Sequence, residues 1–173
     1  MKASIFVGTS LDGFIARANG TFDFLPTDGG EPHGYDEFMA TVDALVIGRK
    51  TYETVLGLAT WPYGAKPTFV LSTRPLAPAP VGAAVERMSG SPVEVVSQLV
   101  NRGFQHAYVD GGITIQGFLQ AGLIQRLTIT RVPVLIGTGI PLFGALPHDV
   151  TLKHIATHQY ASGLVKSEYE ISV

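Results

Sequence analysis

At 173 residues, the chain is most simply a single domain spanning residues 1–173, long enough to bury a sizeable core. Charged residues make up 15% of it and the formal net charge is −2, so its electrostatics give no reason to expect nucleic acid as a partner. The lack of cysteine excludes disulfides, thiolate metal sites and a cysteine nucleophile, and it fits a reducing cytoplasm. No apolar stretch reaches membrane-spanning length, so we expect no membrane partner.

Segments typical of strands and helices alternate up to residue 125. Glycine and proline are frequent over residues 19–34 and predict a long functional or mobile loop. A short helix is expected over residues 35–41. Strands are predicted to begin at Ile5 and to cover residues 44–47, 66–71, 85–88 and 106–109, and helices to cover residues 50–56 and 114–120.

A further helix has an unusually clear start. Ser91, Pro92 and Glu94 supply an N-cap, a proline at the first helical position and the glutamate of a capping box. We predict that Gly103 ends this helix. Its apolar face is expected to consist of Val93, Val96, Leu99 and Val100.

The C-terminal part changes character. Residues 127–130 and 132–136 predict a long β run, and residues 151–160 and 164–171 predict an antiparallel hairpin that turns at Ser162 and Gly163. The fold class is therefore α/β, with a predominantly parallel central sheet, flanking helices and a C-terminal antiparallel hairpin.

Three turns carry the chemical argument, and each follows a predicted strand. The carboxyl ends of parallel strands converge on the ligand crevice of an open α/β sheet. Glycine backbone and free helix N–H groups suit phosphates, and Arg49 and Arg74 suit a 2′-phosphate such as that of NADP. Ordinary loop chemistry is the alternative for each turn. The three turns are Gly48-Arg49-Lys50-Thr51, Leu71-Ser72-Thr73-Arg74 and Asp110-Gly111-Gly112-Ile113-Thr114.

Other chemical signals are weaker. His154 and His158 have a spacing that suits a metal only on a helix, and their segment reads as a strand, so no metal site is expected. Trp61 and Tyr63 either wall a pocket for a flat ligand or cap a hydrophobic cluster. Asp36, early in the short helix, is either a proton donor or a solvated carboxylate.

Four segments occur in an order that resembles a known family. They are Ser10-Leu11-Asp12-Gly13-Phe14-Ile15-Ala16, Val46-Ile47-Gly48-Arg49-Lys50-Thr51-Tyr52-Glu53, Val109-Asp110-Gly111-Gly112 and Val132-Pro133-Val134-Leu135-Ile136-Gly137-Thr138-Gly139-Ile140-Pro141-Leu142-Phe143. Together they resemble the dihydrofolate reductase-like superfamily, in particular the reductase domain of the bifunctional riboflavin-biosynthesis deaminase–reductase.

The resemblance implies NADPH as hydride donor and commonly a homodimer. It also implies a cofactor role for each matching position. Ile15 and Ala16 would lie against the nicotinamide. The phosphates would be held by Gly48, Arg49, Lys50 and Thr51, the adenine and 2′-phosphate by Leu71, Ser72, Thr73 and Arg74, and the pyrophosphate by Gly111, Gly112, Ile113 and Thr114.

The chain also departs from that pattern. Gln125-Arg126 stands where the riboflavin branch usually has an Asp-Glu pair, and no deaminase domain accompanies the reductase-like segment. We therefore expect an NADPH-dependent reductase that transfers a hydride to a small C=N or C=O substrate, pterin- or pyrimidine-like. The alternatives are a non-enzymatic NADP- or nucleotide-binding protein and a phosphosugar or nucleotide enzyme without redox chemistry.

Two expectations concern the proton donor and assembly. Asp12, beside Gly13 and just before the residues expected at the nicotinamide, is a candidate proton donor, and Asp36 is the second. Asp12 can alternatively close the turn through backbone hydrogen bonds. The apolar run from Leu127 to Leu135 reads as too apolar for an open sheet edge, so we expect the C-terminal β region to contribute to a homodimer.

Overall fold

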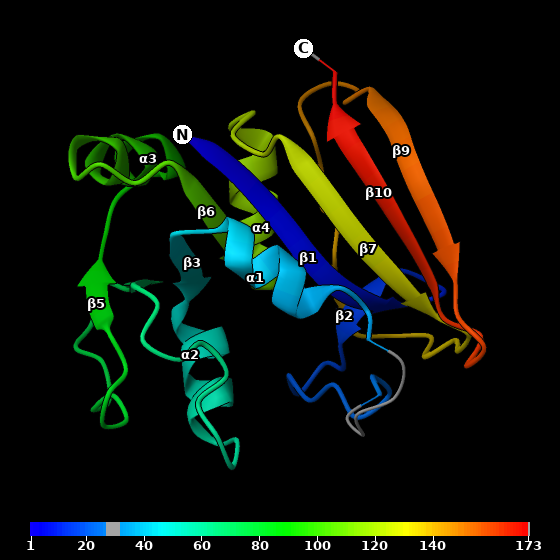
Figure 1. The fold of residues 1–173 in the computed structure, drawn as a ribbon, viewed down its shortest axis with the longest axis horizontal. Helices are drawn as coiled ribbons and strands as arrows, with labels where there is room; N and C mark the ends of the chain where they lie inside the picture. Colours follow the sequence, from blue (N-terminus) through cyan, green and yellow to red (C-terminus); the bar gives the residue numbers. More distant parts are fainter. Residues whose placement is uncertain (27–31, 173) are drawn as a thin grey trace.

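The computed structural model describes residues 1–26 and 32–172, so the predicted loop over residues 19–34 lies partly outside the described residues (Figure 1). The helices are α1 (Tyr35–Thr41), α2 (Arg49–Leu56), α3 (Pro92–Asn101) and α4 (Gly112–Gln120). The strands are β1 (Lys2–Ser10), β2 (Phe14–Ala16), β3 (Ala44–Gly48), β4 (Thr68–Leu71), β5 (Val85–Met88), β6 (His106–Asp110), β7 (Arg126–Val132), β8 (Ile140–Pro141), β9 (Leu152–Gln159) and β10 (Val165–Ile171).

The main sheet confirms the predicted fold class. Within the described chain it has eight strands in the order β5-β4-β3-β6-β1-β7-β10-β9. The strands from β5 to β7 run parallel, whereas β10 is antiparallel to both β7 and β9. Because the parallel strands share one direction, their carboxyl ends lie along one edge, and the turns that follow β3, β4 and β6 lie there together. The separate pair β2–β8 is antiparallel.

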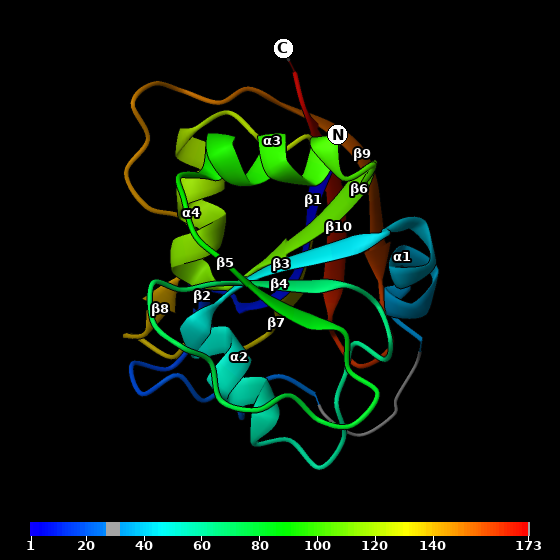
Figure 2. The same ribbon diagram turned by 90° about the vertical axis from the view of Figure 1, so that its left-hand side faces the viewer.

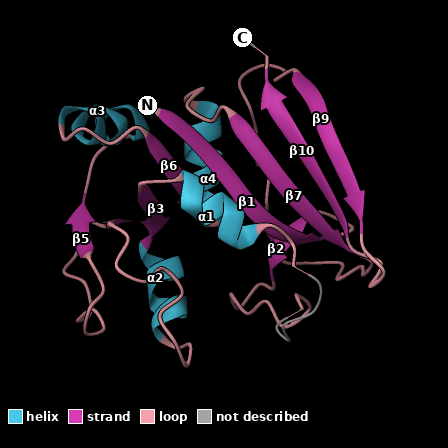
Figure 3. Ribbon diagram, viewed as in Figure 1, coloured by secondary structure: helices cyan, strands magenta, loops and turns pink. Residues whose placement is uncertain are grey.

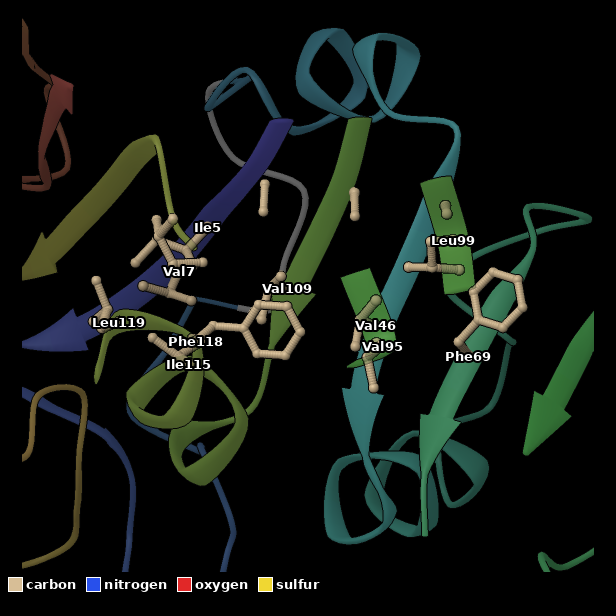
Figure 4. Packing of buried hydrophobic residues seen from close by; sticks show 14 of the residues in the cluster. Ile5, Val7, Val46, Phe69, Val95, Leu99, Val109, Ile115, Phe118 and Leu119 are labelled. Atoms are coloured by element: carbon tan, nitrogen blue, oxygen red, sulfur yellow. The ribbon is translucent and has the colours of Figure 1, made fainter. Parts of the chain in front are cut away.

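Helices cover both faces of the sheet. Figure 2 shows α3 and α4 on one side and α1 on the other. On the first side, Leu99 of α3 and Phe118 of α4 belong to one buried cluster with Ile5 and Val46 from the strands (Figure 4). On the second side, Tyr52 of α2 belongs to a second cluster. Apolar side chains therefore point to both faces, as the continuous apolar runs of the parallel strands predict.

The start of α3 is as predicted, but its buried face is not. Ser91 and Glu94 form the expected capping box, and Gly103 follows the helix with a positive φ of 91°. The fully buried residues of α3 are Val95 and Leu99, which are four residues apart. Val93 is 59% exposed and Val100 46% exposed, so the predicted apolar face was wrong at both positions.

Two further predictions fail in the C-terminal part (Figure 3). The β run does not continue past Val132, because tight turns close there: Val134 N–H donates to the carbonyl of Val132, and Thr138 N–H to that of Ile136. In addition, β7 is not an edge strand, since β1 and β10 pair with it on both sides and Leu127 is 1% exposed. The apolar run is thus buried within the chain itself, which removes the reason given for placing it in a dimer interface.

The edge strand is β9, and it is exposed along its whole length. The predicted hairpin is confirmed by the β9–β10 pairing, but its alternating pattern gives β9 no buried face. Among the described residues, the helices are too short and too polar to cross a membrane.

The packing predicts a sharp contrast between neighbouring positions of α3. Leu99→Ala removes a fully buried side chain and should lower the free energy of unfolding by about 2–5 kcal/mol. Val100→Ala truncates a largely exposed side chain and should change it by no more than about 0.5 kcal/mol. Chemical denaturation of both variants measures the difference, and equal effects would contradict this assignment of the helix face.

Candidate functional site

The central feature of the carboxyl edge is a parting of strands β1 and β6. They pair only from Lys2↔His106 to Ser4↔Tyr108. Beyond that point β1 follows β7 up to Ser10, while β6 follows β3 up to Asp110. We call this divergence the split. The Tyr108 hydroxyl spans it by donating to the carbonyl oxygen of Phe6 at 2.8 Å.

Beside the split, the turns after β3 and β6 meet closely at two glycines. A Cβ on Gly48 would lie 2.8 Å from Thr114 Oγ1, and a Cβ on Gly111 would collide with Thr51 Oγ1. Gly111 also has a positive φ of 97°. Larger residues at these positions would push the turns apart. We call Gly48, Thr51, Gly111 and Thr114 the glycine junction; all four are predicted cofactor residues.

The junction also brings two helix N-termini together. Gly48 is the N-cap of α2 and Gly111 that of α4, and neither position supplies a side-chain cap. Free N–H groups in the first turn of a helix, with the positive end of its dipole, attract phosphate. Predicted residues Arg49, Lys50, Gly112 and Ile113 lie in these first turns.

The third turn is the next along the edge. Leu71 pairs with Gly48, which places the turn after β4 directly beside the junction. Ser72 Oγ accepts from the backbone N–H of Arg74 at 3.0 Å and so closes this turn. Thr73 and Arg74 are exposed. The three turns identified from the sequence therefore follow adjacent strands of the sheet.

Ile15 and Ala16 lie on the other side of the junction, in β2. A Cβ on Gly112 would be 3.2 Å from Ile15 Cδ1 and 2.8 Å from Ile140 Cγ2. Strand β8 pairs with β2, and Leu142 N–H donates to the carbonyl of Gly13 at 3.0 Å. The segment expected at the nicotinamide is thus held against the start of α4.

Asp12 has a role in loop structure. Its carboxylate accepts hydrogen bonds from Gly137 N–H at 2.8 Å and from Ile136 N–H at 3.2 Å. A hydrogen bond from the Ser10 side chain, with these backbone bonds, lowers the pKa of Asp12. A carboxylate held ionised in this way is a poor proton donor, so the geometry favours the turn-closing alternative.

Asp36 is exposed in the first turn of α1. Its charge raises the pKa of the neighbouring Tyr35, behind the larger effects of burial and of Asp110. The described contacts therefore give Asp36 no environment that would prepare it to donate a proton.

Asp110 is the residue that the candidate list omitted. It ends β6 at the split, on the same sheet face as Tyr108, and its Oδ1 accepts from Gly111 N–H at 2.8 Å. Burial raises the pKa of Asp110, with phenols from Tyr35, Tyr63 and Tyr108 nearby. The sequence signal was available: residues 106, 108 and 110 share one face of a strand, which places an acid after a buried tyrosine.

Trp61 and Tyr63 belong mainly to the hydrophobic cluster around α2. Their rings are 5.1 Å apart, and the Trp61 ring is 6.0 Å from that of Tyr52. Tyr63 is 6% exposed, whereas Trp61 is only partly buried. This arrangement favours the cluster alternative for Tyr63.

The glycine junction gives a testable packing constraint. Gly48→Ala should lower the free energy of unfolding by about 1–3 kcal/mol, because the new methyl group meets Thr114 Oγ1. Adding Thr114→Ala should recover much of this loss by removing the opposing hydroxyl. Denaturant unfolding of the single and double variants measures this coupling. Additive losses would show that the two turns do not pack as described.

Comparisons with known proteins agree with this geometry. The sequence matches the RibD C-terminal domain over residues 63–166. The uncharacterized protein YwjB of Bacillus subtilis is 30% identical over 94% of each chain. A crystal structure from Shewanella sp. PV-4, of a protein named for riboflavin biosynthesis, is 37% identical over the whole of both chains, with a TM-score of 0.91. Dihydrofolate reductase from Enterococcus faecalis, solved with NADP(H), shares the fold at 16% identity, with a TM-score of 0.67 over 99% of this chain and 97% of that one. The chain therefore belongs to the RibD C-terminal domain family, whose reductase-like members have the dihydrofolate reductase-like fold.

Proposed function

We propose that this protein is an NADPH-dependent reductase that transfers a hydride to a C=N or C=O bond of a small pterin- or pyrimidine-like substrate. The observation that carries the proposal is the glycine junction beside the split. Two uncapped helix N-termini meet there, next to a parted pair of strands. A diphosphate and a flat ring are the chemical groups that such a site suits best.

The residues present fit an NADP-type cofactor. The first turns of α2 and α4 would hold the diphosphate through backbone N–H groups and the hydroxyls of Thr51 and Thr114. The turn Leu71–Arg74 would take the adenosine end, and Ile15 and Ala16 the nicotinamide. When bound, NADPH would supply the hydride. The shared fold of the Enterococcus faecalis enzyme, which was solved with NADP(H), supports this assignment.

The acceptor side requires a flat surface and an acid. Phe6 lies on β1 just past the last β1–β6 pair, and its ring packs against Tyr35 at 5.6 Å. Hydride transfer leaves negative charge on the acceptor atom, which a proton must neutralise. Asp110 is better suited to provide it than Asp12 or Asp36, because burial favours its neutral form.

Cofactor choice tests the proposal. The chain has a single tryptophan, Trp61, whose fluorescence can follow binding. NADPH should bind more tightly than NADH, because a guanidinium meets the 2′-phosphate. A charge-assisted contact is worth about 1.5–3 kcal/mol, so its loss should weaken NADPH binding roughly tenfold to a hundredfold.

The two candidate arginines differ in their present partners. Arg49 forms an ion pair with Glu53 at 2.7 Å, whereas no described residue pairs with Arg74. We therefore expect Arg74→Ala to cost more NADPH affinity than Arg49→Ala, with NADH affinity little changed. Lys153→Ala on the distant strand β9 is the control for losing one positive charge. Equal affinity of the wild type for NADPH and NADH would overturn the assignment.

Turnover distinguishes the proposed enzyme from its alternatives. NADPH oxidation is measured at 340 nm (~) against a panel of pterins and aminopyrimidines. Oxidation that depends on one of these compounds supports the reductase. Tight NADPH binding without turnover on the whole panel supports a non-enzymatic NADP-binding protein, and conversion of a phosphosugar without NADPH supports the third alternative.

We further propose a homodimer that forms through the exposed strand β9. Leu152 and Ile155 on it are 40% and 39% exposed, and the strand contains no proline. A long open edge of this kind favours pairing with a second copy. The opposite edge strand, β5, is shorter and carries Glu86 and Arg87.

Light scattering tests this assembly. The wild type should have twice the mass of the chain at micromolar concentration, and Ile155→Lys should shift it toward the monomer. Leu11→Lys, which alters a side chain that is 56% exposed away from β9, should leave the dimer intact. A monomeric wild type would contradict the proposal.

A further inference from the structure

One face of β6 carries the polar groups of the split. Tyr108 and Asp110 are two residues apart on this strand, so both side chains point to the side on which α1 lies. Tyr108 is only 4% exposed. Its hydroxyl donates to the carbonyl oxygen of Phe6 at 2.8 Å, on the far side of the split. Beyond Ser4 this carbonyl faces no ladder partner on β6, because the pairing of the two strands has ended.

That bond determines what Tyr108 can offer Asp110. The two side chains also share a hydrogen bond. A phenol has one hydrogen, and here Phe6 receives it, so toward Asp110 the phenol oxygen acts as an acceptor. The hydrogen between the two side chains must then belong to the carboxyl group. Asp110 Oδ1 already accepts from Gly111 N–H at 2.8 Å, which leaves Oδ2 to carry that hydrogen.

The groups around Asp110 are consistent with a neutral acid. Tyr35 faces it from α1, Tyr63 from the segment after α2, and Tyr108 from β6 itself. Burial raises the pKa of all three phenols, that of Tyr35 to about 12, so they are uncharged at neutral pH. The remaining charge nearby is Asp36, which acts on Tyr35 and is negative.

We propose that Tyr108 is a positioning residue, which accepts a hydrogen bond from Asp110 and holds that side chain as a carboxylic acid at the split. This inference rests on the proposed reductase function for the fate of the proton. In that reaction the acceptor carbon gains the hydride of NADPH, and the acceptor nitrogen or oxygen gains the proton from Asp110 Oδ2. Asp110 is left as a carboxylate and takes a new proton from water before the next turnover.

Infrared difference spectroscopy of the cofactor-free protein tests the hydrogen bond directly. A protonated carboxylic acid has its own C=O band, and Asp110→Asn identifies the band of Asp110. In the wild type this band should persist above the pH at which ordinary aspartic acids ionise. Tyr108→Phe removes the acceptor and keeps the ring, so the band should disappear at a lower pH than in the wild type.

The direction of the change is decisive. If Tyr108 instead donated its hydrogen to an ionised Asp110, Tyr108→Phe would move the transition to a higher pH, and this result would overturn the proposal. An unchanged transition would overturn it as well. Tyr63→Phe is the matched control, because it removes another buried phenol facing Asp110 and should lower the transition less than Tyr108→Phe does.

The readout is independent of the proposed function. NADP⁺ titration of wild type and Tyr108→Phe by Trp61 fluorescence should give equal affinities. If NADP⁺ fails to bind the wild type, the proposed reductase function is wrong, while the infrared result still decides the role of Tyr108. Where a substrate is found, Tyr108→Phe should lower kcat roughly tenfold or more and move the alkaline limb of the pH profile to lower pH, with KM for NADPH unchanged.

Discussion

The arrangement of this protein depends on where strand β1 stops pairing with β6. A parallel ladder satisfies backbone groups evenly, so ending it early leaves groups that need other partners. The structure meets this need at one carbonyl with a side chain, since the Tyr108 hydroxyl donates to Phe6. The two strands can then diverge without exposing an unpaired carbonyl at that point. The opening that results is part of the fold, and it requires no movement to form.

The same edge shows how local stability gives way to a site. A serine or aspartate cap at the start of α2 or α4 would stabilise the helix by about 1 kcal/mol, as Ser91 does for α3. Glycine stands at both positions instead. These glycines permit the close contacts with Thr51 and Thr114, and they leave first-turn N–H groups free of side-chain caps. Departures from local preference of this kind are expected at functional sites.

Local patterns were sufficient for much of the fold. Helix α1 was predicted with its observed bounds, and the capping box placed the start of α3, because both signals lie within a few neighbouring residues. The adjacency of the three turns followed from one rule about parallel strands. The buried face of α3 could not be predicted in this way. Valines on several sides of the helix give similar patterns, and contacts with the sheet decide which of them is covered.

The missed site residue shows the limit most clearly. Asp12 and Asp110 are both aspartates next to glycine at the carboxyl edge of the sheet, and local sequence treats them alike. Asp12 is separated by 124 residues from one of the backbone donors that fix its charge, so no local pattern reveals them. Asp110 is surrounded by phenols that come from three separate segments.

Environment therefore gives these two aspartates opposite properties. Hydrogen bonds hold Asp12 ionised, and burial favours the neutral form of Asp110. Two carboxyl groups whose pKa values are pushed in opposite directions mark an assignment of roles: the ionised group braces a loop, and the neutral group is available as an acid. In this protein the loop that Asp12 braces precedes β2, the strand against which the nicotinamide is proposed to lie. The two residues thus contribute to the same proposed reaction, one through the position of the cofactor and the other through the proton.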